Sequence, residues 1–286
     1  MGDRTSTTVT GYPDDALAFA IDLAHAAGEI VRQVHLTGPR AIASKQTAVD
    51  LITEADLASE RLIVEAIRAT YPDHGIYAEE ANGGEDFAKM NQTYEGVWMI
   101  DPLDGTTNFA HGLPFVGISI ALQWQGEVVL GVVYEAIRGT CYWAELGKGA
   151  WCEGRRMRVS RSRELGECVL ATGFSYDRAT NPDNNTREVT CLVPRVQGIR
   201  RMGVAALDLA LVADGRLDGY WEARLNPWDW AAGALMVREA GGRVTDYEGR
   251  EWKPGMETCV ASNRRVHEAL LSCIQTARQW PLPPMP

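Results

Sequence analysis

Two aspartates, Asp101 and Asp104, stand in the segment WMIDPLDGTTNFAHG and have the type and spacing that could do chemistry. An apolar run ends in Asp101, and Pro102 and Gly105 favour a turn that brings Asp104 out beside it. Asp104 also suits a helix cap, so the amides after it, as far as Thr107, should point outward like a helix N-terminus. Hard carboxylate oxygens without a Lys or Arg nearby in sequence suit Mg²⁺, which in turn suits phosphate. The segment therefore predicts a cation site beside an anion site.

Further carboxylates stand where other expected elements begin or end. Glu79 and Glu80 close the segment IYAEE at an expected strand end, and Asp229 lies in the first turn of the helix expected in NPWDWAAGALMVREAGG. Asp50 lies just before another expected helix. Open sheets place ligands beyond strand ends, which would bring Glu79 near Asp101. Taken alone, Asp50 is better explained as a solvated or turn-capping residue, whereas the Glu79–Glu80 pair suits a solvated strand end as well as a functional site.

Other familiar site patterns do not fit. GKGAW lacks the Ser or Thr of a phosphate loop, and no GxGxxG opens a helix, which excludes both usual nucleotide-binding loops. GISIA is not GxSxG, so Ser119 is expected to be a strand residue, and a lone His111 is more often structural than a ligand. DPLDGT is similar to the DxDGT of aspartyl-nucleophile phosphatases, but a spacing of three, not two, would separate Asp101 and Asp104 onto different strand faces. That spacing weakens a covalent aspartyl-phosphate mechanism.

The elements that must position these residues divide the chain into two halves. We expect a flexible arm at 1–12, an N-terminal α+β half at 13–160 that carries most of the acidic site, a C-terminal α/β half at 161–279, and a tail at 280–286. The first half contains two amphipathic helices and a meander of β-branched strands, and the second alternates strand and helix. The polar segment from Ala81 to Gly96 is expected to be a surface loop, and 243–252 a hairpin.

Composition limits the class of protein. The 286 residues carry a formal charge of −10 with a pI near 5.1, which argues against nucleic acid as the main partner because backbone binding needs a basic stripe. No run of about 18 apolar residues appears, and the Thr-rich start lacks the apolar core of a signal peptide. We therefore expect a cytoplasmic protein without a membrane partner. The six cysteines form no CxxC pair, which indicates reduced and mostly buried thiols.

Four blocks in order resemble the inositol monophosphatase family, within the metal-dependent, lithium-sensitive phosphatases that include fructose-1,6-bisphosphatase. They are DLITEAD, the AEE of IYAEE, WMIDPLDGTTNFAHGLPFVGISIAL and WDWAAGALMVREAGG. GIRRMGVAALDLALVADGRLDGYWE also resembles the family's substrate-side segment, and the matches span roughly Lys45 to Asp246. The resemblance implies a layered αβαβα sandwich, a homodimer, and Mg²⁺-dependent hydrolysis of a small phosphate monoester.

The resemblance also implies the metal ligands. Glu79, Asp101 and the backbone carbonyl of Leu103 would hold a first Mg²⁺, and Asp101, Asp104 and Asp229 a second, so that Asp101 bridges the two ions. Glu79 would serve a weaker third site through water, which gives two to three ions per subunit. Mg²⁺ keeps several of its waters, so few protein ligands suffice.

The same resemblance implies how substrate is handled. Thr106, with Asp50 behind it, would orient and deprotonate an attacking metal-bound water, without a phosphoenzyme, and the Gly105 and Thr106 amides would hold phosphate oxygens. Glu80 would support the ligands indirectly. The positions that match contacts to the alcohol part of the substrate are Gly203, Val204, Ala205 and Glu222. Many relatives have Ser or Thr where this chain has Val204, which removes one polar contact and bears on inositol specificity.

The sequence thus predicts a phosphatase for inositol 1-phosphate or a similar polyol phosphate, with a small phosphorylated alcohol as its partner. Histidinol phosphate, fructose 1,6-bisphosphate and nucleotide 3′-phosphates are the alternatives inside the family. A non-catalytic binding protein with this fold is the alternative of another class.

Overall fold

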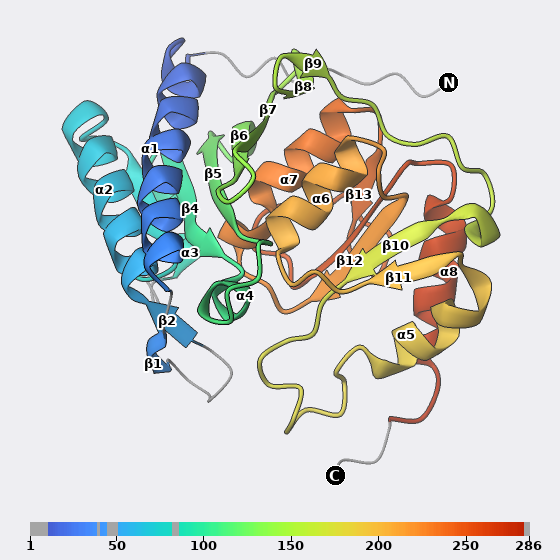
Figure 1. The fold of residues 1–286 in the computed structure, drawn as a ribbon. Helices are drawn as coiled ribbons and strands as arrows, with labels where there is room; N and C mark the ends of the chain where they lie inside the picture. Colours follow the sequence, from blue (N-terminus) through green and yellow to red (C-terminus); the bar gives the residue numbers. More distant parts are fainter. Residues whose placement is uncertain (1–10, 39–40, 45–50, 82–85, 283–286) are drawn as a thin grey trace.

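The computed structural model describes residues 11–38, 41–44, 51–81 and 86–282, so most of the predicted arm, part of the tail and Asp50 lie outside the described residues. Five layers alternate helix and sheet, as Figure 1 shows. The predicted αβαβα sandwich is confirmed.

The first layer is a pair of helices, α1 (Ala16–Thr37) and α2 (Glu54–Thr70), packed on one face of the larger sheet. The buried residues of α1 recur at three- and four-residue intervals, which gives the helix one apolar face toward the sheet. At the start of α2, Thr53 and Asp56 form a reciprocal capping box, which satisfies two backbone amides and fixes where the helix begins.

The larger sheet has seven strands in chain order, with one parallel pair and antiparallel pairing elsewhere. Its central strands are buried on both faces, so they read as continuous apolar runs rather than as an alternation. The predicted meander forms its middle. The strands are β3 (Gly75–Ala78), β4 (Gly96–Asp104), β5 (Gly117–Trp124), β6 (Glu127–Glu135), β7 (Thr140–Glu145), β8 (Gly149–Cys152) and β9 (Arg155–Arg156).

The segment from Ala81 to Gly96 is not wholly a loop, and that prediction was wrong. It contains the short helix α3 (Phe87–Thr93), which begins because the Asp86 carboxylate accepts a hydrogen bond from the Ala88 amide at 2.9 Å. Phe87 and Met90 are buried on the same side of this helix. A helix this short contains only three apolar residues, which are too few to show a helical period within a polar segment.

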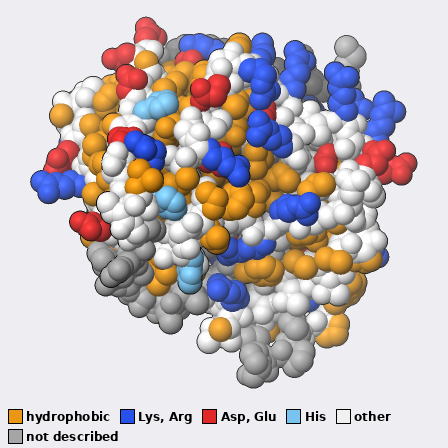
Figure 2. Space-filling model, viewed as in Figure 1, with side chains coloured by type: hydrophobic (Ala, Val, Ile, Leu, Met, Phe, Trp, Pro, Cys, Tyr) orange, Lys and Arg blue, Asp and Glu red, His pale blue; other side chains and the backbone are white. Residues whose placement is uncertain are grey.

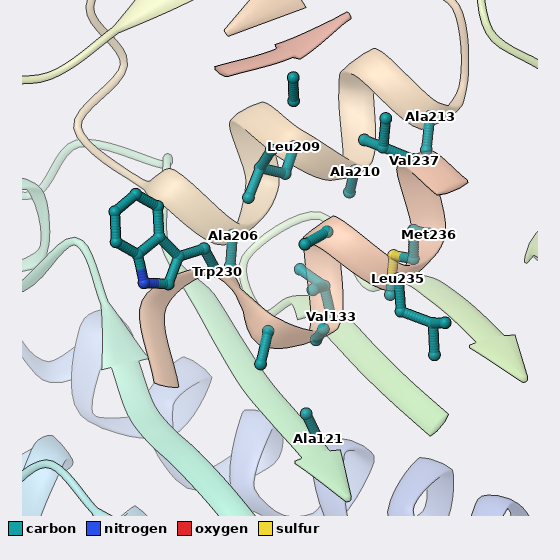
Figure 3. Close-up of a cluster of buried hydrophobic side chains, with 14 of the residues drawn as sticks. Ala121, Val133, Ala206, Leu209, Ala210, Ala213, Trp230, Leu235, Met236 and Val237 are labelled. Atoms are coloured by element: carbon teal, nitrogen blue, oxygen red, sulfur yellow. The ribbon is translucent and has the colours of Figure 1, made fainter. Parts of the chain in front are cut away.

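The middle layer consists of α6 (Ala205–Ala213) and α7 (Pro227–Glu239), which lie between the two sheets and contact both. Both helices are buried nearly all round, and their alanines let them approach each other closely. Figure 3 shows this packing, in which Leu209 and Trp230 lie above strand residues Ala121 and Val133. Because α6 and α7 are tightly packed between the two sheets, the N-termini of both helices are held in fixed positions beside the site.

Gly131 sets the distance between β6 and α7. A Cβ atom at this position would lie 2.6 Å from the Cα atom of Ala232, which is backbone and cannot rotate away. We expect Gly131→Ala to lower the free energy of unfolding by about 1–3 kcal/mol through overpacking, measured by urea denaturation. Gly166→Ala is the matched control, since nothing lies within 4 Å of its Cβ position. An equal effect of both substitutions would contradict this packing account.

The second sheet has five strands, β11 (Gly198–Arg200), β10 (Val169–Thr172), β12 (Gly219–Ala223), β14 (Thr258–Ser262) and β13 (Arg243–Thr245), in that order. The last layer is formed by α5 (Thr186–Leu192) and α8 (His267–Arg278), which pack on each other outside this sheet. The predicted hairpin at 243–252 is confirmed in part, because an antiparallel bridge joins Thr245 to Glu251, but β13 has its main pairing with β14.

The remaining pieces are small. Strands β1 (Ala41–Ser44) and β2 (Leu51–Thr53) form a separate antiparallel pair, and α4 (Thr106–Ala110) follows β4. Two single turns of 3₁₀ helix lie at Leu165–Glu167 and Val193–Arg195. All six cysteines are free thiols and five of them are buried, as predicted. Within the described residues, no helix has the length and apolar character needed to cross a membrane.

Candidate active site

Strand β4 brings Asp101 and Asp104 to the same side of the sheet. Asp101 pairs with Ser119 and Asp104 pairs with Gly117, so three steps along β4 match two steps along β5. This irregularity is a β-bulge, and it cancels the odd spacing that was expected to send the two carboxylates to different faces. The Asp101 side chain is buried and its Oδ1 accepts a hydrogen bond from the Leu103 amide at 3.0 Å.

Gly105, rather than Asp104, is the N-cap of α4. Its φ of +99° lies in the left-handed region, and a Cβ atom there would lie 2.9 Å from the Phe115 carbonyl oxygen. Asp104 is therefore released from capping, and its Oδ2 instead accepts a hydrogen bond from the Ala206 amide at 2.7 Å. The contact ties the turn after β4 to the first turn of α6.

Two other elements bring the remaining acidic residues to this place. Asp229 lies in the first turn of α7, where its Oδ2 accepts a hydrogen bond from the Asn226 amide at 2.6 Å in a capping box. Glu79 directly follows β3, and its amide donates to the Ile100 carbonyl oxygen at 3.1 Å, which places it beside Asp101. The carboxylate cluster is formed by Glu79, Asp101, Asp104 and Asp229.

Burial and mutual repulsion disfavour the negative charges of the carboxylates in the cluster. Burial raises the pKa of Asp101 well above its usual value, and the negative charges of the other three carboxylates raise it further. Burial is also the main cause that raises the pKa of Asp104 and of Asp229. Among the described residues, Asp101, Asp104 and Asp229 form no ion pair with Lys or Arg. Three buried carboxylates without a Lys or Arg partner among the described residues call for an external cation.

The donor set fits Mg²⁺ in its chemistry, because every side-chain donor is a hard carboxylate oxygen. Within the described part of the chain, no three Asp, Glu, His or Cys side chains converge as a closed ligand group. Backbone amides fix the carboxylates of Asp101, Asp104 and Asp229. Such an arrangement suits an ion that keeps several waters and takes only a few protein ligands.

We expect the pH dependence of stability to reveal this cluster. A carboxyl whose folded pKa exceeds its unfolded pKa stabilises the fold at low pH, and this contribution is lost as pH rises through the folded value. The folded pKa is about 6 for Asp56 and about 7 for Glu222, and raised for the buried members of the cluster. The Tm of the metal-free protein should therefore fall between about pH 5.5 and about pH 8.

Added Mg²⁺ should restore that stability, because a cation offsets the repulsion among ionised carboxylates. At about 100 times its Kd it should contribute about 2.7 kcal/mol, and the gain should be larger at pH 8 than at pH 5.5. The measurement is thermal denaturation followed by circular dichroism with and without Mg²⁺. An equal gain at both pH values would argue against binding to these carboxylates.

Thr106 has a partner that the sequence did not predict. Its hydroxyl donates to Oδ1 of Asp56 at 3.0 Å, and the Leu103 carbonyl oxygen is a second, longer acceptor at 3.2 Å. The other oxygen of Asp56 caps α2 through the Thr53 amide at 2.8 Å. Burial raises the pKa of Asp56 to about 6, although its hydrogen bonds lower it. The sequence signal for this partner was Asp56 itself, the last residue of DLITEAD. Its predicted role in capping a helix was enough to explain that residue, so no second role was predicted.

Glu80 directly follows Glu79, and the charge of Glu222 acts on Asp104 and Asp229. The Glu80 amide donates to Oε2 of the buried Glu60 at 2.7 Å, which holds the chain just after Glu79. Glu222 is buried at the end of β12 and accepts a hydrogen bond from the Tyr220 hydroxyl at 2.5 Å. Burial is the main cause that raises the pKa of Glu222 to about 7, against the opposing effects of Tyr220 and Arg201.

A cavity of about 300 Å³ opens beside the turn after β4. Its lining includes the predicted residues Asp104, Gly105, Thr106 and Gly203. It also includes residues that were not predicted, namely Phe174, Tyr176, Arg178 and Arg201, together with Leu51, Thr107 and the exposed His111.

Other predicted site residues lie behind the cavity wall. The Val204 side chain is fully buried, so only its backbone could meet a ligand, and Ala205 begins α6. Ser119 is a buried strand residue whose hydroxyl donates to the Trp228 carbonyl oxygen at 2.9 Å, which confirms that it is not a nucleophile at the surface.

Comparison with known proteins gives concordant results. The sequence model of the inositol monophosphatase family matches residues 13–279. The chain is 43% identical to an inositol-1-monophosphatase of Synechocystis over 239 residues, which cover 84% of this chain and 82% of that protein. It is 40% identical to Nus factor SuhB of Escherichia coli strain K12 over 257 residues, which cover 90% and 94% of the two chains.

Solved structures agree with the fold. The inositol monophosphatase of Anabaena (Nostoc) superposes with a TM-score of 0.81 at 39% identity, covering 94% of this chain and 97% of that one. An inositol monophosphatase of Thermotoga maritima gives a TM-score of 0.82 at 37% identity, covering 93% and 98%. The chain therefore belongs to the inositol monophosphatase family and is a phosphatase that hydrolyses phosphate monoesters.

Proposed function

We propose that this protein is a Mg²⁺-dependent phosphatase that hydrolyses inositol 1-phosphate or a similar small polyol phosphate by direct attack of water. The observation that carries the proposal is the carboxylate cluster, whose buried aspartates have no cationic partner among the described residues. It adjoins the Gly105 turn at the start of α4, whose amides would donate to an anion. The substrate and the identity of the metal are parts of this proposal.

The metal ligands follow from the positions of the cluster. Glu79, Asp101 and the Leu103 carbonyl would hold one Mg²⁺, while Asp101, Asp104 and Asp229 would hold a second, and a third ion near Glu79 would bind largely through water. When bound, Mg²⁺ supplies positive charge that acidifies water and stabilises the oxygens of the reacting phosphate. Asp101 is the buried member with the other three carboxylates acting on it, so it is assigned the bridging position.

Thr106 and Asp56 would handle the proton of the attacking water. Because the Thr106 hydroxyl hydrogen points to Asp56, the lone pairs of its oxygen can accept a hydrogen bond from water. As the water oxygen bonds to phosphorus, its proton would pass to Thr106 while the Thr106 proton moves to Asp56, and the ester P–O bond would break so that the alcohol oxygen leaves and takes a proton from solvent water. A pKa of about 6 lets Asp56 act as a base near neutral pH. In this proposal Asp56 replaces Asp50 as the partner of Thr106.

The rest of the cavity would bind the ester. The amides of Gly105 and Thr106, at the start of α4, would donate to phosphate oxygens. Glu222 would accept a hydrogen bond from a substrate hydroxyl, since it lies at a strand end with one carboxylate oxygen engaged by Tyr220. Gly203 and the backbone of Val204 and Ala205 would border the alcohol part.

The test is phosphate release from a panel comprising inositol 1-phosphate, histidinol phosphate, fructose 1,6-bisphosphate and adenosine 3′,5′-bisphosphate, with and without Mg²⁺ and with added Li⁺. We expect Mg²⁺-dependent release, inhibited by Li⁺, with polyol phosphates ranked first. A first rank for histidinol phosphate or the nucleotide would overturn the proposed substrate class. The predicted homodimer and cytoplasmic location remain predictions.

One observation favours a second function. Relatives about 40% identical to this chain are named Nus factor SuhB. The chain could therefore also act as a binding protein, and the expected lack of a nucleic-acid partner stays untested. Wild-type protein that binds Mg²⁺ but releases no phosphate from the whole panel would favour this alternative.

A further inference from the structure

The loop after β10, at 173–185, forms one wall of the cavity beside the turn after β4. Phe174, Tyr176 and Arg178 of this loop line the cavity. The loop has no helix or strand of its own, and Tyr176 is 48% exposed, so little apolar packing holds it. Polar contacts must therefore fix the position of this wall.

The loop borders the side from which a phosphate ester would approach. In Figure 1 it is the yellow segment between β10 and α5, at the lower centre of the view. On the same face in Figure 2, Lys and Arg side chains lie at the lower centre, whereas the Asp and Glu side chains in view lie above it and at the edges. An anionic ester would therefore meet little negative charge on this side.

Arg224 joins the two acidic residues of this loop. Its Nη1 atom lies 3.1 Å from Oδ2 of Asp177, and its Nη2 atom lies 3.6 Å from Oδ2 of Asp183. The planar guanidinium presents several donors in a fixed geometry, so one side chain can hold both carboxylates. Because Asp177 lies near the tip of the loop and Asp183 near its end, these contacts fold the loop back on itself.

Asp183 extends the network to the two outer helices. Arg187 of α5 donates to its Oδ1 at 2.6 Å, and Arg278 of α8 donates to its Oδ2 at 3.0 Å. Burial alone would raise the pKa of Asp183, but the hydrogen bonds from Arg278 and Arg187 lower it below its usual value. The carboxylate is therefore ionised at neutral pH, and it anchors the end of the loop to α5 and α8.

Arg224 also continues the strand that carries Glu222, the proposed acceptor for a substrate hydroxyl. It directly follows β12, and its amide donates to the Glu257 carbonyl oxygen at 2.6 Å. The first residue of the loop passes close to Glu222, since a Cβ atom on Gly173 would overlap its carboxylate oxygens. The position of the loop relative to Glu222 therefore depends on Arg224.

The backbone of Arg224 is strained. Its φ of +64° lies in the left-handed region, which costs free energy for a residue with a Cβ atom and suits glycine better. The side chains of Arg224 and Asp177 are 32% and 43% exposed, so their ion pair should contribute little to stability. An arginine in a conformation that favours glycine, with contacts that stabilise the fold only weakly, indicates a functional role in positioning.

We propose that Arg224 is a positioning residue for substrate discrimination, because it holds the loop at 173–185 against the strand end that carries Glu222. The two parts together would form the wall that fits the alcohol of the ester. Within the described part of the chain, Arg224 is not among the residues that line the cavity, so it would act through the loop and not on the reacting phosphate. This inference rests on the proposed function and adds a residue that determines its specificity.

The test compares inositol 1-phosphate with methyl phosphate, whose alcohol part is too small to reach the loop. In Arg224→Gly, KM for inositol 1-phosphate should rise about tenfold with kcat changed less than about twofold, because the loop must then be ordered on binding. Both constants for methyl phosphate should stay unchanged. Arg224→Lys should restore part of the difference, since it keeps the charge without the planar fork.

Arg264→Gly is the matched control. Arg264 also has a left-handed φ, of +71°, and is exposed, and it forms no ion pair with any residue that the structure describes. Both glycine variants relieve the same backbone strain and gain the same freedom in the unfolded chain, so their Tm values should shift alike. The rise in KM for inositol 1-phosphate should occur in Arg224→Gly alone.

The outcomes separate this proposal from the function on which it rests. Equal changes for both esters in Arg224→Gly, or the same changes in Arg264→Gly, would overturn the positioning role while leaving the phosphatase intact. Hydrogen–deuterium exchange decides the matter even when no ester is hydrolysed. The hydrogen-bonded loop amides of Arg178, Thr180 and Asn181 should exchange about tenfold faster in Arg224→Gly and at the wild-type rate in Arg264→Gly. Unchanged exchange in Arg224→Gly would overturn the proposal.

Discussion

Replacing Asp101 by Asn should lower kcat/KM for phosphate release by about a thousandfold, more than the 10- to 100-fold typical of residues that only support a ligand. Asn keeps the shape of the side chain but removes one negative charge from the place where both Mg²⁺ ions are proposed to meet. The same variant should have a higher Tm than wild type without metal, because burial and the neighbouring carboxylates disfavour the Asp101 charge. Its Tm gain with Mg²⁺ should be smaller.

These opposite effects on activity and stability are measured by steady-state kinetics and thermal denaturation. Asp73→Asn is a control that removes the same charge at an exposed position. If Asp101→Asn retained near-normal turnover and an unchanged response to Mg²⁺, the bridging assignment would be wrong.

Replacing Asp56 by Asn should lower kcat by about 10²- to 10⁴-fold, the contribution typical of a positioned acid or base. Asn cannot take the Thr106 proton, whereas the carboxylate of Asp56 accepts it across a 3.0 Å hydrogen bond. The affinity for Mg²⁺ should change little, because Asp56 is not among the proposed ligands. The loss of its helix cap should cost about 1 kcal/mol of stability, so folding must be checked by circular dichroism.

Asp50→Asn is the decisive comparison for this second prediction. The sequence resemblance gave the role behind Thr106 to Asp50, whereas we propose Asp56 because its carboxylate accepts the hydrogen bond of the Thr106 hydroxyl. Thr106→Val should reproduce the loss of kcat without disturbing the α2 cap. A large loss in Asp50→Asn together with normal turnover in Asp56→Asn would restore the sequence-based assignment.

Local patterns in the sequence predicted much of the carboxylate cluster. An apolar run ending in Asp101 and the helix start at Asp229 are both features of single elements, and the structure contains both. The β-bulge between Asp101 and Asp104 could not be predicted, because it depends on the register with β5. The spacing of three looked unfavourable until that register was known.

The residues that act together with the cluster could be identified only from the tertiary structure. Asp56 looked like a capping residue because one of its oxygens caps α2, and only the approach of α4 reveals the second bond to Thr106. Arg178 and Arg201 come from irregular segments without periodicity, so no sequence signal marks them as facing the same cavity. Contacts between side chains that different loops carry cannot be predicted from local sequence patterns.

The most direct test of the central claim is phosphate release from inositol 1-phosphate as Mg²⁺ is added to protein stripped of metal with a chelator. The account predicts no release at first, then a rise that saturates with Mg²⁺ in the wild type and is absent from Asp101→Asn. Release that is the same with and without Mg²⁺, or that Asp101→Asn supports equally well, would contradict the assignment of the carboxylate cluster as the catalytic metal centre.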